Sequence, residues 1–77
     1  MKIVYSEHAK EKIEERKISE KIIETAILRP DKILESRFER KIIHKIIGSK
    51  LLRVVVKEEN DIFIVITAYY TKPERYG

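Results

Sequence analysis

Residues 40–57 of the chain read RKIIHKIIGSKLLRVVVK, and the rest of the predicted sheet is built outward from this stretch. Aliphatic runs rich in β-branched residues lie on both sides of the pair Gly48-Ser49. A glycine-containing pair between two such runs is typical of a β-hairpin closed by a two-residue turn. The stretch therefore predicts two antiparallel strands whose register is fixed by the turn.

The basic residues of this hairpin gather on one face of the predicted sheet. In the register of the two-residue turn, His44 lies opposite Arg53, and Arg40 lies opposite Lys57. Because successive side chains of a strand point to opposite faces, these four residues share one face. The other face is aliphatic and we expect helices to cover it; it carries Ile43, Ile47, Leu52, Val54 and Val56.

Two helices are expected before the hairpin. Ser6 can cap a helix that runs to about Lys17, and Ser19 can cap a second helix that Pro30 ends. Residues 2–5 are a short β-prone opening. After residue 31 the pattern changes to short β-branched runs, which predict four strands over 32–38, 41–47, 50–57 and 62–71.

Short connections make consecutive strands antiparallel, since a parallel pair needs a long crossover. The 77 residues, without an internal repeat or linker, form a single domain, 1–77. The predicted fold class is α+β, with two N-terminal helices packed on one face of an antiparallel meander sheet of about four strands.

The positive charge is concentrated in the middle of the chain. The net charge is +4, but residues 31–57 alone hold eight basic and three acidic side chains. Such a patch fits a polyanion, RNA or DNA, or an acidic protein partner, and it is equally consistent with a lysine-rich solvated surface. The longest apolar run, Ile62–Ile66, is too short to span a membrane, and we expect a cytoplasmic protein.

Metal and cofactor sites are not expected. The chain has no Cys, and His8 and His44 stand far apart without metal-ligand spacing. There is no glycine-rich phosphate loop or nucleophile elbow. Eleven Lys and eleven Glu, with no Cys, are the balance expected of a thermophile.

Loop lengths decide which further residues join the basic face. An even loop at Phe38-Glu39 would place Glu35 and Arg37 there, and an even loop at Glu59-Asn60 would place Tyr70 there. One extra residue in a loop would move its strand to the other face. The predicted cluster is Glu35, Arg37, His44, Arg53, Lys57 and Tyr70.

This cluster contains what metal-independent RNA cleavage requires. Attack by a ribose 2′-hydroxyl needs a general base, Glu35 or His44, and cations for the developing charge, among them Arg53. Tyr70 would stack on a base or donate a proton. RNA binding would involve Arg37, Arg40, Lys45 and Lys57. The alternative interpretation is an ion-paired ladder on the polar outer face of an antiparallel sheet.

The remaining aromatic and motif residues have simpler interpretations. Tyr69 and Tyr70 point to opposite faces, so only one of them can be a nucleic-acid platform. Tyr76 follows Pro73 in a tail that we expect to be disordered. His8 and Arg16 lie on one side of the first helix, and structural roles are favoured for both.

The motif S-x-H-A at residues 6–9, followed by R-x-I-S at residues 16–19, carries a resemblance. With the second helix ending at Pro30 and the later strand runs, the chain resembles small bacterial and archaeal domains of unknown function grouped with the RelE/ParE-like toxin superfamily. The similarity extends from Tyr5 to about Tyr70. Superfamily members place two N-terminal helices on an antiparallel sheet; the best-known are toxins that cut mRNA, often on the ribosome, while others inhibit gyrase.

The resemblance implies roles for particular residues. Arg53 resembles the catalytic Arg of RelE-type toxins, and Tyr70 resembles their terminal Tyr, whereas the motif itself maps to His8 and Arg16. The final strand, 62–71, lacks the basic residue that RelE-type nucleases commonly keep there.

Two functions from different classes follow. The first is a RelE-like toxin-type domain that binds RNA, including ribosome-bound mRNA, and acts as a metal-independent endoribonuclease. The second is a non-catalytic protein- or nucleic-acid-binding module of a toxin–antitoxin-like pair. An acidic antitoxin is the implied protein partner, and an uncovered sheet edge would allow a homodimer.

Overall fold

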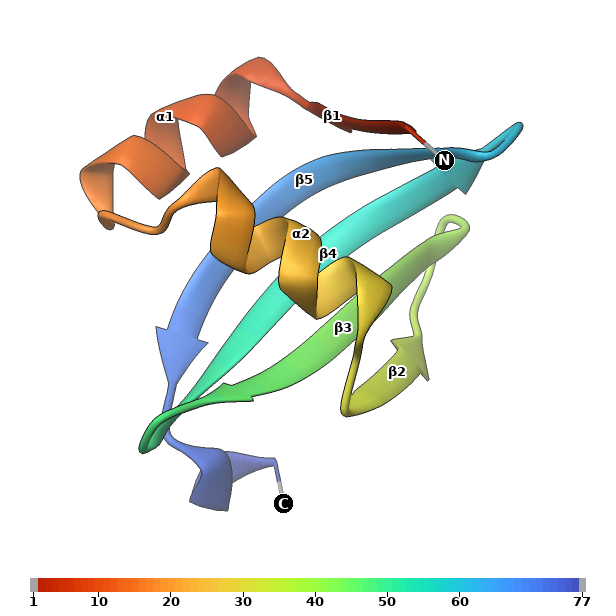
Figure 1. Ribbon diagram of the computed structural model, residues 1–77. Coiled ribbons are helices and arrows are strands. Elements are labelled where there is room, and N and C mark those ends of the chain that lie inside the picture. Colours follow the sequence, from red (N-terminus) through yellow and green to blue (C-terminus); the bar gives the residue numbers. More distant parts are fainter. Residues whose placement is uncertain (1, 77) are drawn as a thin grey trace.

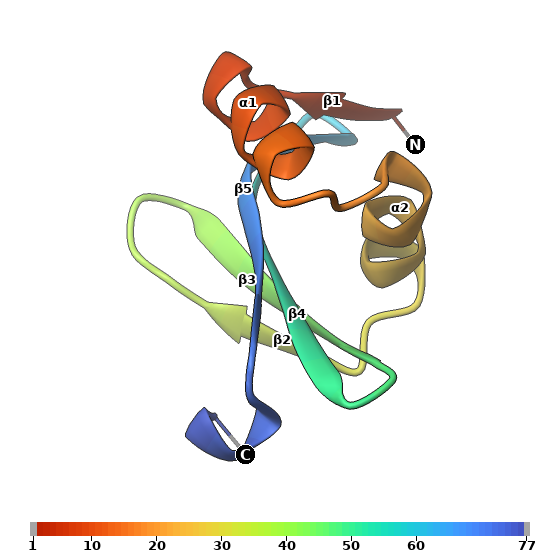
Figure 2. The same cartoon turned by 90° about the vertical axis from the view of Figure 1, so that its left-hand side faces the viewer.

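The computed structural model describes residues 2–76 as two helices packed on one five-stranded sheet (Figures 1 and 2). The two helices lie on the same face of the sheet, which we call the helix face, and the opposite side is the open face. In chain order the elements are β1 Lys2–Tyr5, α1 Glu7–Glu15, α2 Glu20–Leu28, β2 Lys32–Glu35, β3 Arg40–Ile47, β4 Lys50–Glu59, β5 Ile62–Thr71 and the 3₁₀ turn η1 Pro73–Arg75. The α+β class predicted from the sequence is confirmed.

Both helices begin at the serines that the sequence indicates. The Oγ of Ser6 accepts a hydrogen bond from the backbone N–H of Ala9 at 3.0 Å, and the Oγ of Ser19 accepts one from Ile22 at 3.1 Å. Each bond satisfies an N–H that has no partner within its helix. No helix within residues 2–76 is long and apolar enough to cross a membrane.

The sheet has one strand more than predicted, and it is mixed. Strands β2 to β5 form the expected antiparallel meander, but β1 adds a fifth strand parallel to β5, giving the order β1-β5-β4-β3-β2. Ile3 pairs with Phe63, which lies sixty residues further along the chain. Nothing local in a four-residue strand reveals such a distant partner.

The central hairpin has the predicted register. His44 lies opposite Arg53 and Arg40 lies opposite Lys57. Gly48 occupies the turn with a φ of +63°, a left-handed conformation that glycine adopts without steric cost. The open face therefore carries the basic residues of β3 and β4, as expected.

The prediction that Glu35 lies on the open face is wrong. The loop between β2 and β3 has three residues, Arg37 to Glu39, because Ser36 pairs with Arg40 through its backbone N–H. Phe38 and Glu39 both have positive φ, which closes this odd loop without glycine. Glu35 consequently lies opposite Lys41, on the helix face.

The prediction that Tyr70 lies on the open face is also wrong. The partners of β4 shift between Val55 and Val56, and the register shift leaves Ile66 of β5 as the extra residue of a bulge. Beyond this bulge every side chain of β5 changes face. Tyr70 lies opposite Leu52 and packs against the core, and its neighbour Tyr69 takes the open-face position opposite Arg53.

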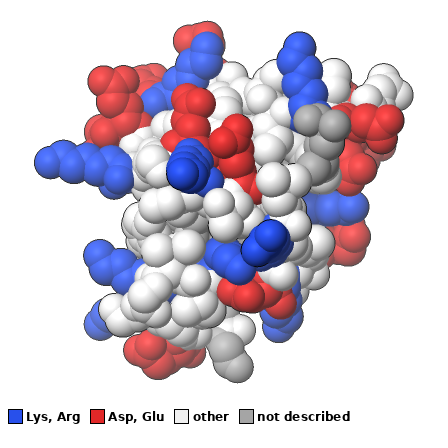
Figure 3. Space-filling view, in the orientation of Figure 1, with Lys and Arg blue, Asp and Glu red and all other residues white. Residues whose placement is uncertain are grey.

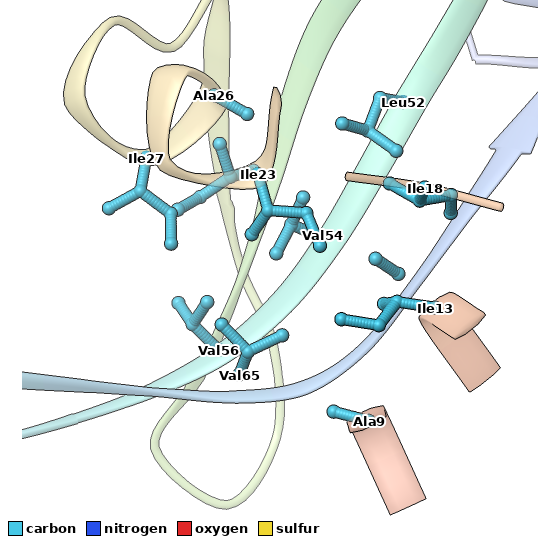
Figure 4. Packing of buried hydrophobic residues seen from close by; sticks show 12 residues of the cluster. Ala9, Ile13, Ile18, Ile23, Ala26, Ile27, Leu52, Val54, Val56 and Val65 are labelled. Atoms are coloured by element: carbon cyan, nitrogen blue, oxygen red, sulfur yellow. The ribbon is translucent and has the colours of Figure 1, made fainter. Parts of the chain in front are cut away.

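The hydrophobic core lies between the helices and the sheet (Figure 4). Aliphatic residues of α1, α2 and the segment between them meet β4 and β5. Burying one such side chain stabilises the fold by about 1.5–3 kcal/mol. The largest fully buried side chains are Ile23, Leu52, Val54, Val56 and Val65.

Candidate functional site

Two polar residues are buried on the open face, where β3 and β4 run side by side. Arg53 is 9% exposed and His44 is 4% exposed. The Nε of Arg53 donates a hydrogen bond to the Nε2 of His44 at 3.0 Å. No other charged or polar residue within residues 2–76 is so little exposed as these two. A charged guanidinium hydrogen-bonded to an imidazole is therefore the distinguishing feature of this face.

Two tyrosines complete what we call the open-face cluster, His44, Arg53, Tyr69 and Tyr76. The Nη1 of Arg53 donates to the hydroxyl of Tyr69. The ring of Tyr76 lies over the guanidinium, with its centroid 4.0 Å from Cζ of Arg53, and meets the His44 ring edge-on at 5.6 Å. The C-terminal segment, expected to be disordered, instead folds through η1 at the end of β5 (Figure 2). Its Tyr76 ring covers the pair.

Burial and neighbouring charges favour the neutral form of His44. Burial lowers the pKa of His44 below its ordinary value, and the positive charges of Arg53 and Lys32 lower it further. Lys32 lies directly opposite His44 on β2. Because Nε2 accepts the Arg53 hydrogen bond, the ring proton of the neutral imidazole is assigned to Nδ1.

Arg16 reaches the edge of this cluster from the end of α1. Its Nη1 donates to the backbone oxygen of Ala68 at 2.9 Å and to Oγ1 of Thr67 at 3.3 Å, and its guanidinium lies 6.0 Å from the ring centre of Tyr69. Nearby, the backbone N–H of Ser6 donates a hydrogen bond to the backbone oxygen of Val65 at 3.1 Å. Arg16 and Ser6 thus bond the edge of β5 where β1 no longer covers it.

His8 does not belong to the open-face cluster. It is an exposed residue in the first turn of α1, a helix that packs on the helix face of the sheet. Of the motif residues 6–9, Ser6 caps the helix and Ala9 is fully buried. The fold accounts for these two residues directly, and it gives His8 no contact with the buried pair.

The predicted RNA-binding residues are placed differently from one another. Arg40 and Lys57 lie on the open face, paired across β3 and β4, and Lys57 also contacts Glu59 at 3.2 Å. Arg37 is exposed in the β2–β3 loop. Lys45 lies opposite Leu52 on the helix face, where its Nζ is 3.7 Å from Asp31.

The structure also identifies residues that sequence reasoning missed. Lys32, Tyr69 and Tyr76 all contribute to the surroundings of His44 and Arg53. The sequence predicts Tyr70 rather than Tyr69 on the open face because the bulge in β5 has no local sequence signal. Tyr76 follows a proline near the end of the sequence, a position that predicts a disordered tail and gives no sign of packing against Arg53.

A pocket of about 280 Å³ opens beside His44 at the end of the open face. Ile46 and Leu51 supply an aliphatic wall, Tyr76 an aromatic one, and Lys32 a positive charge at the rim. Flat apolar walls beside hydrogen-bonding groups suit a nucleobase, which binds through stacking and polar edges. The full lining is Asp31, Lys32, His44, Ile46, Leu51, Pro73 and Tyr76.

The helix face carries charges of both signs, whereas Arg53 is the one charged residue of the open-face cluster. Over the helix face, Lys and Arg side chains are interspersed with Asp and Glu (Figure 3). Acidic side chains are absent from the open-face cluster itself, and the nearest carboxylate that lines its pocket is Asp31. Among residues 2–76, no group of three or more His, Asp or Glu side chains is arranged to hold a metal ion.

One comparison with known proteins gives a match. The sequence model of a family described as "Domain of unknown function (DUF4258)" matches residues 5–70, which is most of the chain. Neither the curated proteins nor the solved structures contain a match.

Proposed function

We propose that this chain, which belongs to the DUF4258 family, is a RelE-like toxin-type domain that binds RNA on the open face and cleaves it without a metal ion. The observation that carries the proposal is the hydrogen bond from Arg53 to His44. It holds a buried cation beside a neutral imidazole, and these are the two groups that phosphodiester cleavage by a 2′-hydroxyl requires. The resemblance of Arg53 to the catalytic Arg of RelE-type toxins supports the same assignment.

The chemistry uses the cluster in a defined order. A phosphate that binds Arg53 competes for its donors and releases Nε2 of His44, which then has a free lone pair. His44 takes the proton of the 2′-hydroxyl, the bond from the 2′-oxygen to phosphorus forms, and the bond to the 5′-oxygen breaks. The leaving 5′-oxygen takes the phenolic proton of Tyr69, whose oxygen lies beside Arg53. The products are a 2′,3′-cyclic phosphate and a 5′-hydroxyl.

Access to the site requires movement of Tyr76. His44 and Arg53 are almost completely buried while the Tyr76 ring covers them. Lys72 and the three-residue η1 link Tyr76 to β5. Displacement of Tyr76 exposes the guanidinium and leaves an aromatic ring available to stack on a base, as single-stranded RNA binding commonly uses.

Cleavage of a labelled mRNA in EDTA, with and without ribosomes, tests the proposal. The wild-type protein is expected to cut, and Arg53→Ala and His44→Ala are each expected to reduce the rate at least 100-fold, the scale of a lost base or charge-stabilising group. His8→Ala is the matched control, an exposed histidine outside the cluster, and is expected to cut at the wild-type rate. Cleavage that survives both cluster substitutions would refute this site.

Both substitutions alter buried residues, so folding is measured alongside activity. Circular dichroism and thermal unfolding show whether each variant retains the native structure. Arg53→Lys provides a second variant that keeps the positive charge but loses the planar set of donors. A folded Arg53→Lys protein with much reduced cleavage supports a catalytic role for the guanidinium.

A specific surface favours a second function, the non-catalytic binding module. Phe38 is 81% exposed in the β2–β3 loop, and the exposed Arg37 and Arg40 lie beside it in the chain. An exposed aromatic side chain beside positive charges is suited to an acidic amphipathic segment, such as that of an antitoxin. Intact RNA in every reaction, together with loss of partner binding in Phe38→Ser, would favour this module over the nuclease.

A further inference from the structure

A second pocket, of about 340 Å³, lies at the end of the β3–β4 hairpin. Its walls come from the turn, the end of β5 and η1, three segments that are separate in the sequence. Three cationic side chains and three hydroxyl groups line it, and no carboxylate does. The lining residues are Ser49, Lys50, Tyr70, Thr71, Lys72 and Arg75.

The fold itself brings these cations together. The two-residue turn places Ser49 and Lys50 at the end of the sheet, where Leu51 pairs with Thr71. The chain then turns back through η1, which adds Arg75 to the same pocket. Lys50 lies over the ring of Tyr70, 5.6 Å from its centre, so its charge is held at the wall of the pocket.

The three cations have little compensation from nearby acidic residues. None of the ion pairs found in residues 2–76 involves Lys50, Lys72 or Arg75. Glu74 lies between two of them on η1 but does not line the pocket. Like charges held in one concave surface repel each other, and a bound anion relieves that repulsion.

We propose that this pocket is a phosphate-binding site. Lysine and arginine side chains hold phosphate oxygens through charge-assisted hydrogen bonds, and the hydroxyls of Ser49 and Thr71 add neutral donors. η1 contributes Arg75 to this pocket and Pro73 to the pocket beside His44, which Tyr76 also lines. If the phosphate comes from RNA, an assignment that rests on the proposed function, it is a backbone phosphate that flanks the nucleotide held at His44.

Binding of a fluorescent single-stranded RNA oligomer, measured by anisotropy at 50 and 200 mM salt, tests the RNA source. For single strands the slope of affinity against salt is about −0.7 for each phosphate neutralised. Lys50→Ala with Lys72→Ala removes the contact to one phosphate and should therefore weaken binding about 2.6-fold more at 50 mM than at 200 mM salt. The matched control removes two exposed lysines of the helices, Lys10→Ala with Lys21→Ala, and is expected to retain the wild-type salt dependence.

Titration with inorganic phosphate, followed by ¹H–¹⁵N NMR, tests the pocket without RNA. Phosphate, but not chloride at equal ionic strength, is expected to shift the backbone amides of Ser49, Lys50 and Thr71, and the shifts should disappear in the double variant. Phosphate shifts with unchanged RNA affinity in the variant would support the site and overturn RNA as its source.

The RNA-binding measurement and the phosphate titration together distinguish failure of this site from failure of the proposed function. A wild-type protein that binds no RNA contradicts the proposed function, and the phosphate titration still decides on the pocket. Absence of phosphate shifts, together with RNA binding that is unchanged in the double variant, overturns the phosphate site.

Discussion

Replacement of Arg53 by methionine removes the guanidinium and keeps most of the aliphatic volume of the side chain. The substitution deprives Nε2 of His44 of its hydrogen-bond donor and removes the cation beneath the Tyr76 ring. A buried acceptor left without a partner costs about 1–3 kcal/mol, and the lost cation–π contact adds about 1 kcal/mol. The substitution also removes the desolvation cost of burying the guanidinium charge, and this gain in stability opposes both losses. We expect a net destabilisation of about 2 kcal/mol.

Thermal unfolding and histidine titration measure the two consequences. For a domain of this size, about 2 kcal/mol lowers the Tm by roughly 8–16 °C. The pKa of His44 is expected to rise in Arg53→Met, because a positive charge and a hydrogen bond to the neutral imidazole are both lost. The Hε1 proton of His44 reports that pKa by NMR.

Lys57→Met is the control for loss of one positive charge from the same strand and face. It leaves the Arg53–His44 hydrogen bond in place, so the pKa of His44 should stay at its wild-type value. If Arg53→Met unfolds at the wild-type temperature and leaves the His44 pKa unchanged, the hydrogen bond between the two side chains contributes nothing in solution. That result would refute the proposed site, which rests on this bond.

Two further predictions concern groups whose pKa values the fold shifts. The folded-state pKa of His44 lies below its ordinary value near 6.5, so on acidification the unfolded chain takes up a proton before the folded chain does. Stability should therefore fall by up to about 1.4 kcal/mol per pH unit below pH 6.5, and urea unfolding of His44→Gln should show a smaller loss. Burial, with the charges of Glu20 and Glu24, raises the pKa of Tyr5 to about 12, and its buried hydroxyl has no hydrogen-bond partner within residues 2–76. Tyr5→Phe should raise the free energy of unfolding by about 1 kcal/mol in urea denaturation, and a loss of stability would show that the hydroxyl is satisfied.

The parts of the fold that local chemistry specifies were predictable from the sequence. Ser6 and Ser19 cap their helices because a serine oxygen can satisfy a free N–H without any distant contact. The Gly48-Ser49 turn gave the correct pairing of His44 with Arg53 because a two-residue loop determines the register of its own hairpin.

The errors arose where tertiary packing determines the backbone. Phe38 and Glu39 adopt positive φ in a loop without glycine, so its odd length has no compositional sign, and Glu35 was assigned to the wrong face. The bulge at Ile66 likewise exchanged the faces of Tyr69 and Tyr70. Each error is a shift of one residue, which in a strand reverses every side chain that follows.

The burial of Arg53 itself bears on the choice between an ion-paired ladder and a functional site. A ladder on a solvated face would keep its charges near water and pair each with an opposite charge, as Lys41 and Glu58 do at 3.1 Å. Arg53 has no carboxylate partner within residues 2–76: its contacts are an imidazole, a phenol and an aromatic ring. Removing a guanidinium from water costs several kcal/mol, which neutral partners repay only in part. These surroundings, with a histidine whose pKa is lowered and a tyrosine ring over the guanidinium, favour the proposed site over the ladder.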